Sequence, residues 1–158
     1  MKTLILYATK HGATREIATR IADNMDGAVL CNLKEDGIPP LAGFDCVIIG
    51  SSLYAGSIRK EARVFLAQHA DQLQGKQVGL FLSGIGGVEA DKKEVFYRAF
   101  PPDLLQGAKA TCFMGGIFDP QKAGAIERFI IKLVTKRSDY MDTIRDEKIR
   151  AFATLMQA

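Results

Sequence analysis

Short apolar runs alternate with longer amphipathic stretches along nearly the whole chain, and this alternation limits the fold more than any other feature. The apolar runs cover residues 3–8, 28–32, 45–50, 77–83 and 110–116, and each ends in small, polar or glycine residues. Such runs are typical of strands buried on both faces of a parallel sheet. Helical patterns cover residues 13–24, 59–70, 91–99 and 146–157. The order predicts an α/β fold with a doubly wound, five-stranded parallel sheet and helices on both faces.

The size and composition are those of one packed domain. With 158 residues, we expect residues 1–158 to fold as a single unit. Apolar residues make up 47% and charged residues 25%, a balance that excludes disorder and a low-complexity scaffold. No apolar run approaches the roughly 20 residues of a membrane span, and a strand-like segment follows Met1-Lys2 without a signal-peptide cleavage pattern. The sequence therefore predicts a cytoplasmic protein.

Charge and cysteine content argue against two further classes of protein. A total of 21 Lys and Arg against 18 Asp and Glu gives a net charge of +3, well short of the basic excess of a nucleic-acid-binding domain. Cys31, Cys46 and Cys112 cannot all pair within one chain and show no Cys-x-x-Cys spacing. We therefore expect no nucleic-acid partner, no disulfide framework and no metal site, and we interpret the cysteines as buried thiols in strands.

The loop that follows the first predicted strand has the composition of an anion site. Because it joins a strand to a helix, its N–H groups lie at a helix N-terminus, where the helix dipole favours negative charge. Thr9 and Thr14 add hydroxyl groups, and Gly12 lets the backbone approach a ligand closely. Lys10 and His11 add positive charge. The loop is either a phosphate site or an ordinary turn capped by Thr9.

Two common nucleotide fingerprints are absent from the sequence. No Gly-x-x-x-x-Gly-Lys-Ser/Thr segment occurs, and Gly84-Ile85-Gly86 is followed by Glu89 where a dinucleotide motif has its third glycine. A phosphate loop without these fingerprints points away from ATP and dinucleotides, and towards a mononucleotide.

The first strand, loop and helix together resemble the signature of the flavodoxin-like family. The residues that carry this resemblance are Ile5, Leu6, Tyr7, Thr9, Gly12, Thr14, Ala18 and Ile21. The resemblance implies a flavodoxin-like sheet with strand order 2-1-3-4-5 and a non-covalently bound FMN.

The resemblance also implies that three strand-end loops hold the cofactor. The expected cofactor-binding residues are Thr9, Lys10, His11, Gly12, Ala13, Thr14, Ser51, Ser52, Leu53, Tyr54, Ala55, Gly56, Ser83, Gly84, Ile85, Gly86 and Gly87, with Ser57 at the end of the second loop. Tyr54 is placed to stack on the flavin, and its alternative role is that of an exposed turn aromatic. The alternative for residues 83–87 is a flexible loop. FMN itself carries the redox chemistry, so no catalytic side chain is assigned.

An additional stretch separates the fifth predicted strand from the last helix and includes a basic amphipathic helix over residues 125–137. Ile126, Phe129, Ile130 and Leu133 share one helical face, while Arg128, Lys132 and Lys136 recur on another. One interpretation packs the apolar face on the body of the protein and leaves the basic stripe in solvent. The other places Ile126 to Arg137 against a membrane surface or an acidic partner. The same helix could also form a homodimer contact.

This stretch, together with Gly115-Gly116-Ile117-Phe118 and Arg15-Glu16-Ile17-Ala18, resembles the menaquinone-dependent protoporphyrinogen dehydrogenases. That resemblance implies an FMN-dependent oxidoreductase that takes electrons from a porphyrinogen and passes them to a quinone, peripherally at the inner face of the membrane. The second hypothesis is a flavodoxin-like FMN electron carrier between protein partners. A third is a flavin-free binding module, although the first strand lacks the acidic cluster of phosphoacceptor domains.

Overall fold

A computed structural model describes residues 1–86 and 93–158, and it contains the expected parallel sheet. Its five parallel strands are β1 (Thr3–Ala8), β2 (Val29–Asn32), β3 (Cys46–Tyr54), β5 (Gln77–Ser83) and β6 (Ala110–Phe113). They lie in the order β2-β1-β3-β5-β6, and the short β4 (Ser57–Ile58) pairs antiparallel with the end of β3. With the five main strands numbered along the chain, this is the flavodoxin-like order 2-1-3-4-5, so the expected topology is confirmed.

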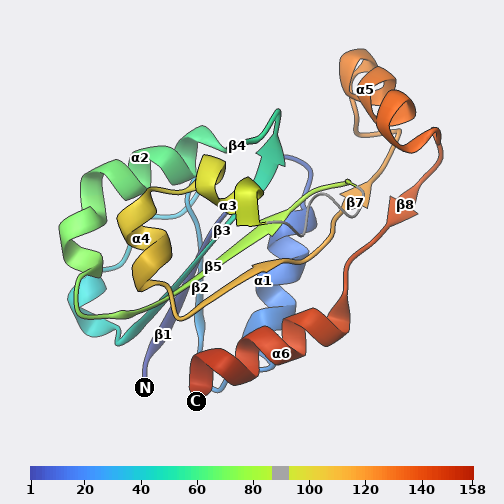
Figure 1. Ribbon diagram of the computed structural model, residues 1–158. Coiled ribbons are helices and arrows are strands. Elements are labelled where there is room, and N and C mark those ends of the chain that lie inside the picture. Colours follow the sequence, from blue (N-terminus) through green and yellow to red (C-terminus); the bar gives the residue numbers. More distant parts are fainter. Residues whose placement is uncertain (87–92) are drawn as a thin grey trace.

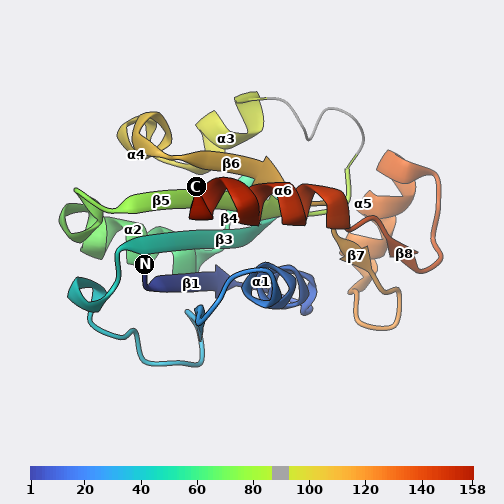
Figure 2. The ribbon, with the colours of Figure 1, turned by 90° about the horizontal axis from the view of Figure 1, so that it is seen from below.

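Helices cover both faces of the sheet. The helices α1 (Ala13–Asp23) and α6 (Asp146–Gln157) lie on one face. The opposite face carries α2 (Lys60–His69), α3 (Lys93–Ala99) and α4 (Pro102–Gly107), as Figures 1 and 2 show. Two 3-10 turns, Leu41–Gly43 and Ala70–Leu73, complete the connections. The predicted layer arrangement is thus confirmed.

The core follows the two-residue period of the strands. In β1, Leu4 and Leu6 belong to the cluster under α2 and α3, whereas Ile5 and Tyr7 belong to the cluster under α1 and α6. Because successive side chains point to opposite faces, a continuous apolar strand fills two cores at once. Cys31 and Cys46 are buried in strands and Cys112 is half-buried, as the sequence indicated. Burial raises the pKa of the Cys46 thiol.

Several element boundaries differ from the sequence-based expectation. β3 continues past residue 50 to Tyr54, because its last two residues pair with β4 across a tight turn at Ala55 and Gly56. β6 ends at Phe113 rather than residue 116. The short α4 was not expected, and the first two residues of the helix predicted over 91–99 lie outside the described residues.

The additional stretch forms a projection beyond the carboxyl ends of the sheet strands (Figures 1 and 2). Its base is the antiparallel pair β7 (Ile117–Phe118) and β8 (Met141–Asp142), and α5 (Ala125–Thr135) lies between these strands in the chain. A small cluster of Phe118, Ala123 and Met141, with Ile85 and Ile131 packed against it, joins the projection to the body.

The apolar face of α5 is exposed. Ile126 is 70%, Phe129 64% and Leu133 65% accessible to solvent. The interpretation that packs this face on the body of the protein is therefore wrong. Ile131, which lies beside this face on the helix, packs on the cluster of Phe118, Ala123 and Met141 instead. The helix therefore contacts the body along the edge that carries Ile131 and not along its apolar face. Among the described residues, no helix has both the length and the apolar composition to cross a bilayer.

Candidate functional site

The loop between β1 and α1 presents the N-terminus of α1 to the carboxyl edge of the sheet. Gly12 is the N-cap residue with φ of +101°, and no side chain of the described chain caps the helix. Thr9 Oγ1 instead accepts a hydrogen bond from the Gly12 N–H at 3.0 Å. Thr9 is therefore not the cap of α1, and the phosphate role of the loop stays a prediction. The geometry leaves the helix terminus suited to an anion.

A buried hydroxyl pair connects this loop to the end of β5. Thr14 Oγ1 and Ser83 Oγ lie 2.7 Å apart, and both residues are almost completely buried. Because water cannot compete for this buried hydrogen bond, it fixes the positions of the two strand-end loops relative to each other. Thr14 therefore positions the β1–α1 loop, which is the predicted phosphate loop, from inside the protein.

The second expected loop is a tight β3–β4 turn. Ala55 and Gly56 have positive φ values of 49° and 78°. Positive φ at both central residues is what a two-residue hairpin turn of type I′ requires. Ser51 is buried, donates a hydrogen bond to the Ser52 carbonyl and accepts one from the Arg59 N–H. The turn leaves the Tyr54 ring half exposed, with Lys10 Nζ 5.7 Å from its centroid. Such a ring is available to pack against a flat ligand.

The three loops enclose one cavity of about 340 Å³, a volume typical of small-molecule sites. The predicted residues that line it are Thr9, Lys10, His11, Ala13, Thr14, Ser52, Leu53, Tyr54, Ala55, Ser83, Gly84 and Ile85. Gly12, Ser51 and Gly56 do not line it but shape the turns beside it, and Gly86 and Ser57 are exposed at its margin. Gly87 lies outside the described residues.

Seven further residues line the cavity without having been predicted. They are Arg59, Gly116, Ile117, Phe118, Glu127, Ile130 and Ile131. Most belong to β7 and α5, so the projection forms one wall of the cavity. Arg59 follows β4, and the only sequence signal for it was its place just after the second loop. The spacing of residues in α5 indicated an amphipathic helix but not which side would face a site.

The glycines at 115 and 116 let three backbone segments pack at the edge of the cavity. Gly115 has φ of +83°, and a Cβ on it would lie 2.0 Å from the Thr143 carbonyl oxygen. A Cβ on Gly116 would lie 2.9 Å from the backbone of Gly84. The Gly84 N–H donates to the Gly115 carbonyl, and the Thr143 N–H donates to that of Gly116. These hydrogen bonds hold both chain segments that lead into and out of the projection beside the loop after β5.

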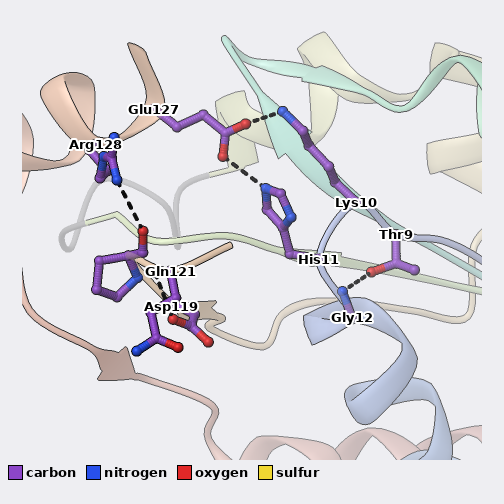
Figure 3. Close-up of polar contacts among 9 residues, drawn as sticks. Thr9, Lys10, His11, Gly12, Asp119, Gln121, Glu127 and Arg128 are labelled. Atoms are coloured by element: carbon purple, nitrogen blue, oxygen red, sulfur yellow. Dashed lines mark hydrogen bonds and ion pairs between the residues drawn. The ribbon is translucent and has the colours of Figure 1, made fainter. Parts of the chain in front are cut away.

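Glu127, in the first turn of α5, connects the projection to the β1–α1 loop (Figure 3). Its carboxylate forms an ion pair with Lys10 and a hydrogen bond with His11, whose Nε2 lies 2.9 Å from Oε2. Partial burial raises the pKa of the Glu127 carboxyl, but hydrogen bonds from Lys10 and His11 and their charges outweigh that effect and lower it overall. Glu127 is therefore ionised at neutral pH.

Comparison with known proteins places this chain in a family. A family model described as a flavodoxin domain matches residues 4–144. Among curated proteins, the chain is similar to the protoporphyrinogen IX dehydrogenase (quinone) of Escherichia coli strain K12, with 25% identity over 157 residues, 94% of this chain and 87% of the relative.

Solved structures show the same fold. A Streptococcus pneumoniae flavodoxin matches with a TM-score of 0.65 and 20% identity, over 99% of this chain and 98% of that one. A Fusobacterium nucleatum flavodoxin bound to flavin mononucleotide matches with a TM-score of 0.53 and 20% identity, over 70% of this chain and 68% of that one. The rubredoxin:oxygen oxidoreductase of Desulfovibrio gigas matches at 0.60 and 15% identity over 98% of this chain, which spans only 35% of that longer one. Because the flavodoxin-domain model covers most of its residues, the chain belongs to the flavodoxin-domain family.

Proposed function

We propose that this protein is an FMN-dependent oxidoreductase that oxidises a porphyrinogen and passes the electrons to a quinone, with residues 1–158 acting as one flavodoxin-like unit. The observation that carries the proposal is the single cavity in which the uncapped N-terminus of α1 meets the ends of β3 and β5. The family of the chain and its FMN-bound structural neighbour support FMN as the cofactor. The likeness to the Escherichia coli dehydrogenase supports the choice of substrate and acceptor.

The cavity residues suit a phosphate monoester joined to a flat ring. Thr9 and the first residues of α1, Ala13 and Thr14, line the cavity, and backbone N–H groups at a helix N-terminus would hold the phosphate there. Leu53, Tyr54 and Ile85 supply apolar and aromatic surface for the ring. FMN, when bound, supplies the redox chemistry, and the protein orients it. Phe118 and Ile131 exclude water from the side that α5 covers.

A cationic side chain in the cavity wall favours an anionic substrate such as a porphyrinogen with propionate groups. Arg59 lines the cavity and, unlike Lys10, is not paired with Glu127. Arg59 Nε is buried and lies 4.0 Å from Glu61 Oε2, and neither atom has a hydrogen-bond partner among the described residues. A carboxylate arriving at the cavity would be attracted by the charged Arg59 guanidinium, which lines its wall.

We also propose that the exposed face of α5 rests on an anionic bilayer, which would place the protein peripherally at the cytoplasmic face of a membrane. Ile126, Phe129, Ile130, Leu133 and Val134 are 42–70% exposed. Lys122, Arg128, Lys132 and Lys136 lie on or beside the same helix. A short helix with an apolar face and a basic border suits the boundary between acyl chains and anionic headgroups. Because Ile130 and Ile131 also line the cavity, a quinone dissolved in the bilayer would approach the flavin from this side.

The proposed activity is tested in two stages. The purified protein is titrated with FMN and, in parallel, with riboflavin, and binding is followed by visible absorption and flavin fluorescence. We expect a clear preference for FMN. Porphyrinogen oxidation is then measured with a menaquinone analogue, and a rate no higher than that of free FMN would reject the dehydrogenase assignment.

A second candidate is an FMN electron carrier between protein partners. It is favoured by the full-length structural likeness to the Streptococcus pneumoniae flavodoxin. It predicts one-electron exchange with a flavodoxin reductase or a ferredoxin-type donor. Failure of every such donor to reduce the FMN-loaded protein would count against it.

Thr14→Ala tests whether the buried hydroxyl pair positions the phosphate loop. The substitution removes one hydrogen bond and leaves the Ser83 hydroxyl buried without its partner. We expect FMN binding to weaken by about 0.5–1.5 kcal/mol, or roughly two- to tenfold in Kd. Thr19→Ala, a half-buried threonine of the same helix that lies outside the cavity and whose hydroxyl donates to the Arg15 carbonyl, is the control. Equal FMN affinities in all three proteins would remove Thr14 from the site.

A further inference from the structure

Lys10 and His11 of the β1–α1 loop already share an anionic partner that belongs to the projection. Lys10 and His11 both contact the Glu127 carboxylate, although Glu127 lies more than a hundred residues further along the chain. Figure 3 shows both side chains reaching away from the loop towards the first turn of α5. All three residues line the candidate cofactor cavity. An acidic side chain is unusual in the wall of a pocket that receives a phosphate, because like charges repel.

The Glu127 cluster is sheltered enough for its charges to matter. The Glu127 side chain is 21% exposed, His11 33% and Lys10 42%. Pairs of this kind are less screened by solvent than fully exposed surface pairs. A phosphate monoester carries a charge of about −1.5 to −2 at neutral pH, far more than one carboxylate. If it binds to residues 9–14, it lies beside the same two side chains that contact Glu127, Lys10 and His11.

We propose that Glu127 competes with the phosphate of FMN for Lys10 and His11. This competition lowers the affinity for FMN and makes the attachment of α5 to the body depend on whether FMN is bound. This inference rests on the proposed FMN site and adds a role for one residue of the projection. When the phosphate binds the Lys10 ammonium and the His11 ring N–H, Glu127 loses its two partners. Removal of its charge by substitution removes the competitor.

The attachment of α5 to the body explains why the helix would respond. Only Glu127, Ile131 and Thr135 of α5 are half-buried, and they are spaced four residues apart along one edge. Ile131 packs on the small apolar cluster at the base of the projection, and Thr135 bonds within its own helix and the turn that follows it. Glu127 therefore provides the polar attachment of the first turn of α5, and releasing it would loosen that turn.

Glu127→Gln is the first test, because glutamine keeps the size and a hydrogen-bonding oxygen while removing the charge. We expect FMN to bind about three- to tenfold more tightly than to the wild type. Riboflavin, which has no phosphate, should bind both proteins equally. Glu147→Gln, an equal change of charge in the first turn of α6 and outside the cavity, should leave both affinities unchanged. FMN binding that is unchanged or weaker in Glu127→Gln would overturn the proposal.

Hydrogen exchange provides a readout independent of affinity. FMN should increase amide exchange at the start of α5 in the wild type, while riboflavin should not. In Glu127→Gln this segment should exchange faster from the outset and not respond to FMN. Slower amide exchange at the start of α5 after FMN is added would contradict the proposed competition. A wild type that binds neither flavin would instead reject the proposed function itself, so the two failures are distinguishable.

Discussion

Gly115→Ala is expected to lower the free energy of unfolding by about 2–5 kcal/mol. The residue has φ of +83°, where a side chain costs roughly 1–2 kcal/mol. The new Cβ would also lie 2.0 Å from the Thr143 carbonyl oxygen, and overpacking of this kind costs about 1–3 kcal/mol. Backbone atoms cannot rotate away as a flexible side chain can, so the two effects should add. Urea unfolding followed by circular dichroism measures the loss.

The damage should be greatest beside the cofactor cavity. Gly115 accepts a hydrogen bond from Gly84 of the loop after β5, so a shift here moves a wall of the site. We therefore expect weaker FMN binding as well as lower stability. Gly124→Ala is the matched control, because Gly124 precedes α5 with φ of −72° and a Cβ there meets no atom within 4 Å. A Gly115→Ala protein as stable as this control would contradict the contact.

The double variant Phe129→Ser and Leu133→Ser is expected to reduce binding to anionic vesicles by at least about tenfold. Each side chain is more than 60% exposed on α5, so the protein core should be unaffected. A buried large apolar side chain contributes roughly 1.5–3 kcal/mol, and even partial insertion of two exceeds the 1.4 kcal/mol of a tenfold change. Sedimentation with vesicles of phosphatidylcholine and phosphatidylglycerol measures the partitioning.

Two comparisons show whether the exposed face of α5 binds a bilayer or another partner. Leu155→Ser, an exposed leucine of α6, should bind vesicles as the wild type does. Vesicles of phosphatidylcholine alone, and high salt, should weaken wild-type binding because each Lys or Arg near an anionic surface contributes about 1 kcal/mol. A wild type that ignores vesicles but forms a dimer, lost in the double variant, would assign the face to a second copy of this chain.

The sheet could be predicted from sequence because its signals are local. Each strand carries its own apolar run, and the loop at residues 9–14 carries hydroxyl, glycine and cationic residues within six positions. Tyr54 and Ser83 followed from the rule that ligands bind at strand ends. The assignment of these residues to FMN stays a prediction until the cofactor is titrated.

Residues that the sequence did not reveal depend on contacts between distant segments. Glu127 joins the site only because β7 and β8 hold α5 beside the phosphate loop, which no spacing encodes. The exposure of Phe129 could not be predicted either, because an amphipathic pattern is the same whether its apolar face is covered or free. The β3–β4 turn was missed because Ala55 adopts a positive φ that alanine rarely takes.

The pairing of β7 with β8 makes the projection separable from the rest of the chain. Phe118 and Met141 are direct partners across this antiparallel pair, so residues 119–140 leave and rejoin the body at the same point. A two-residue turn could close that gap, as in any short hairpin. A trimmed protein of this kind would keep all five parallel strands and the phosphate loop. Comparing its flavin binding with that of the whole chain would isolate what the cavity wall from the projection, with Glu127, Ile130 and Ile131, adds to the parallel-sheet domain.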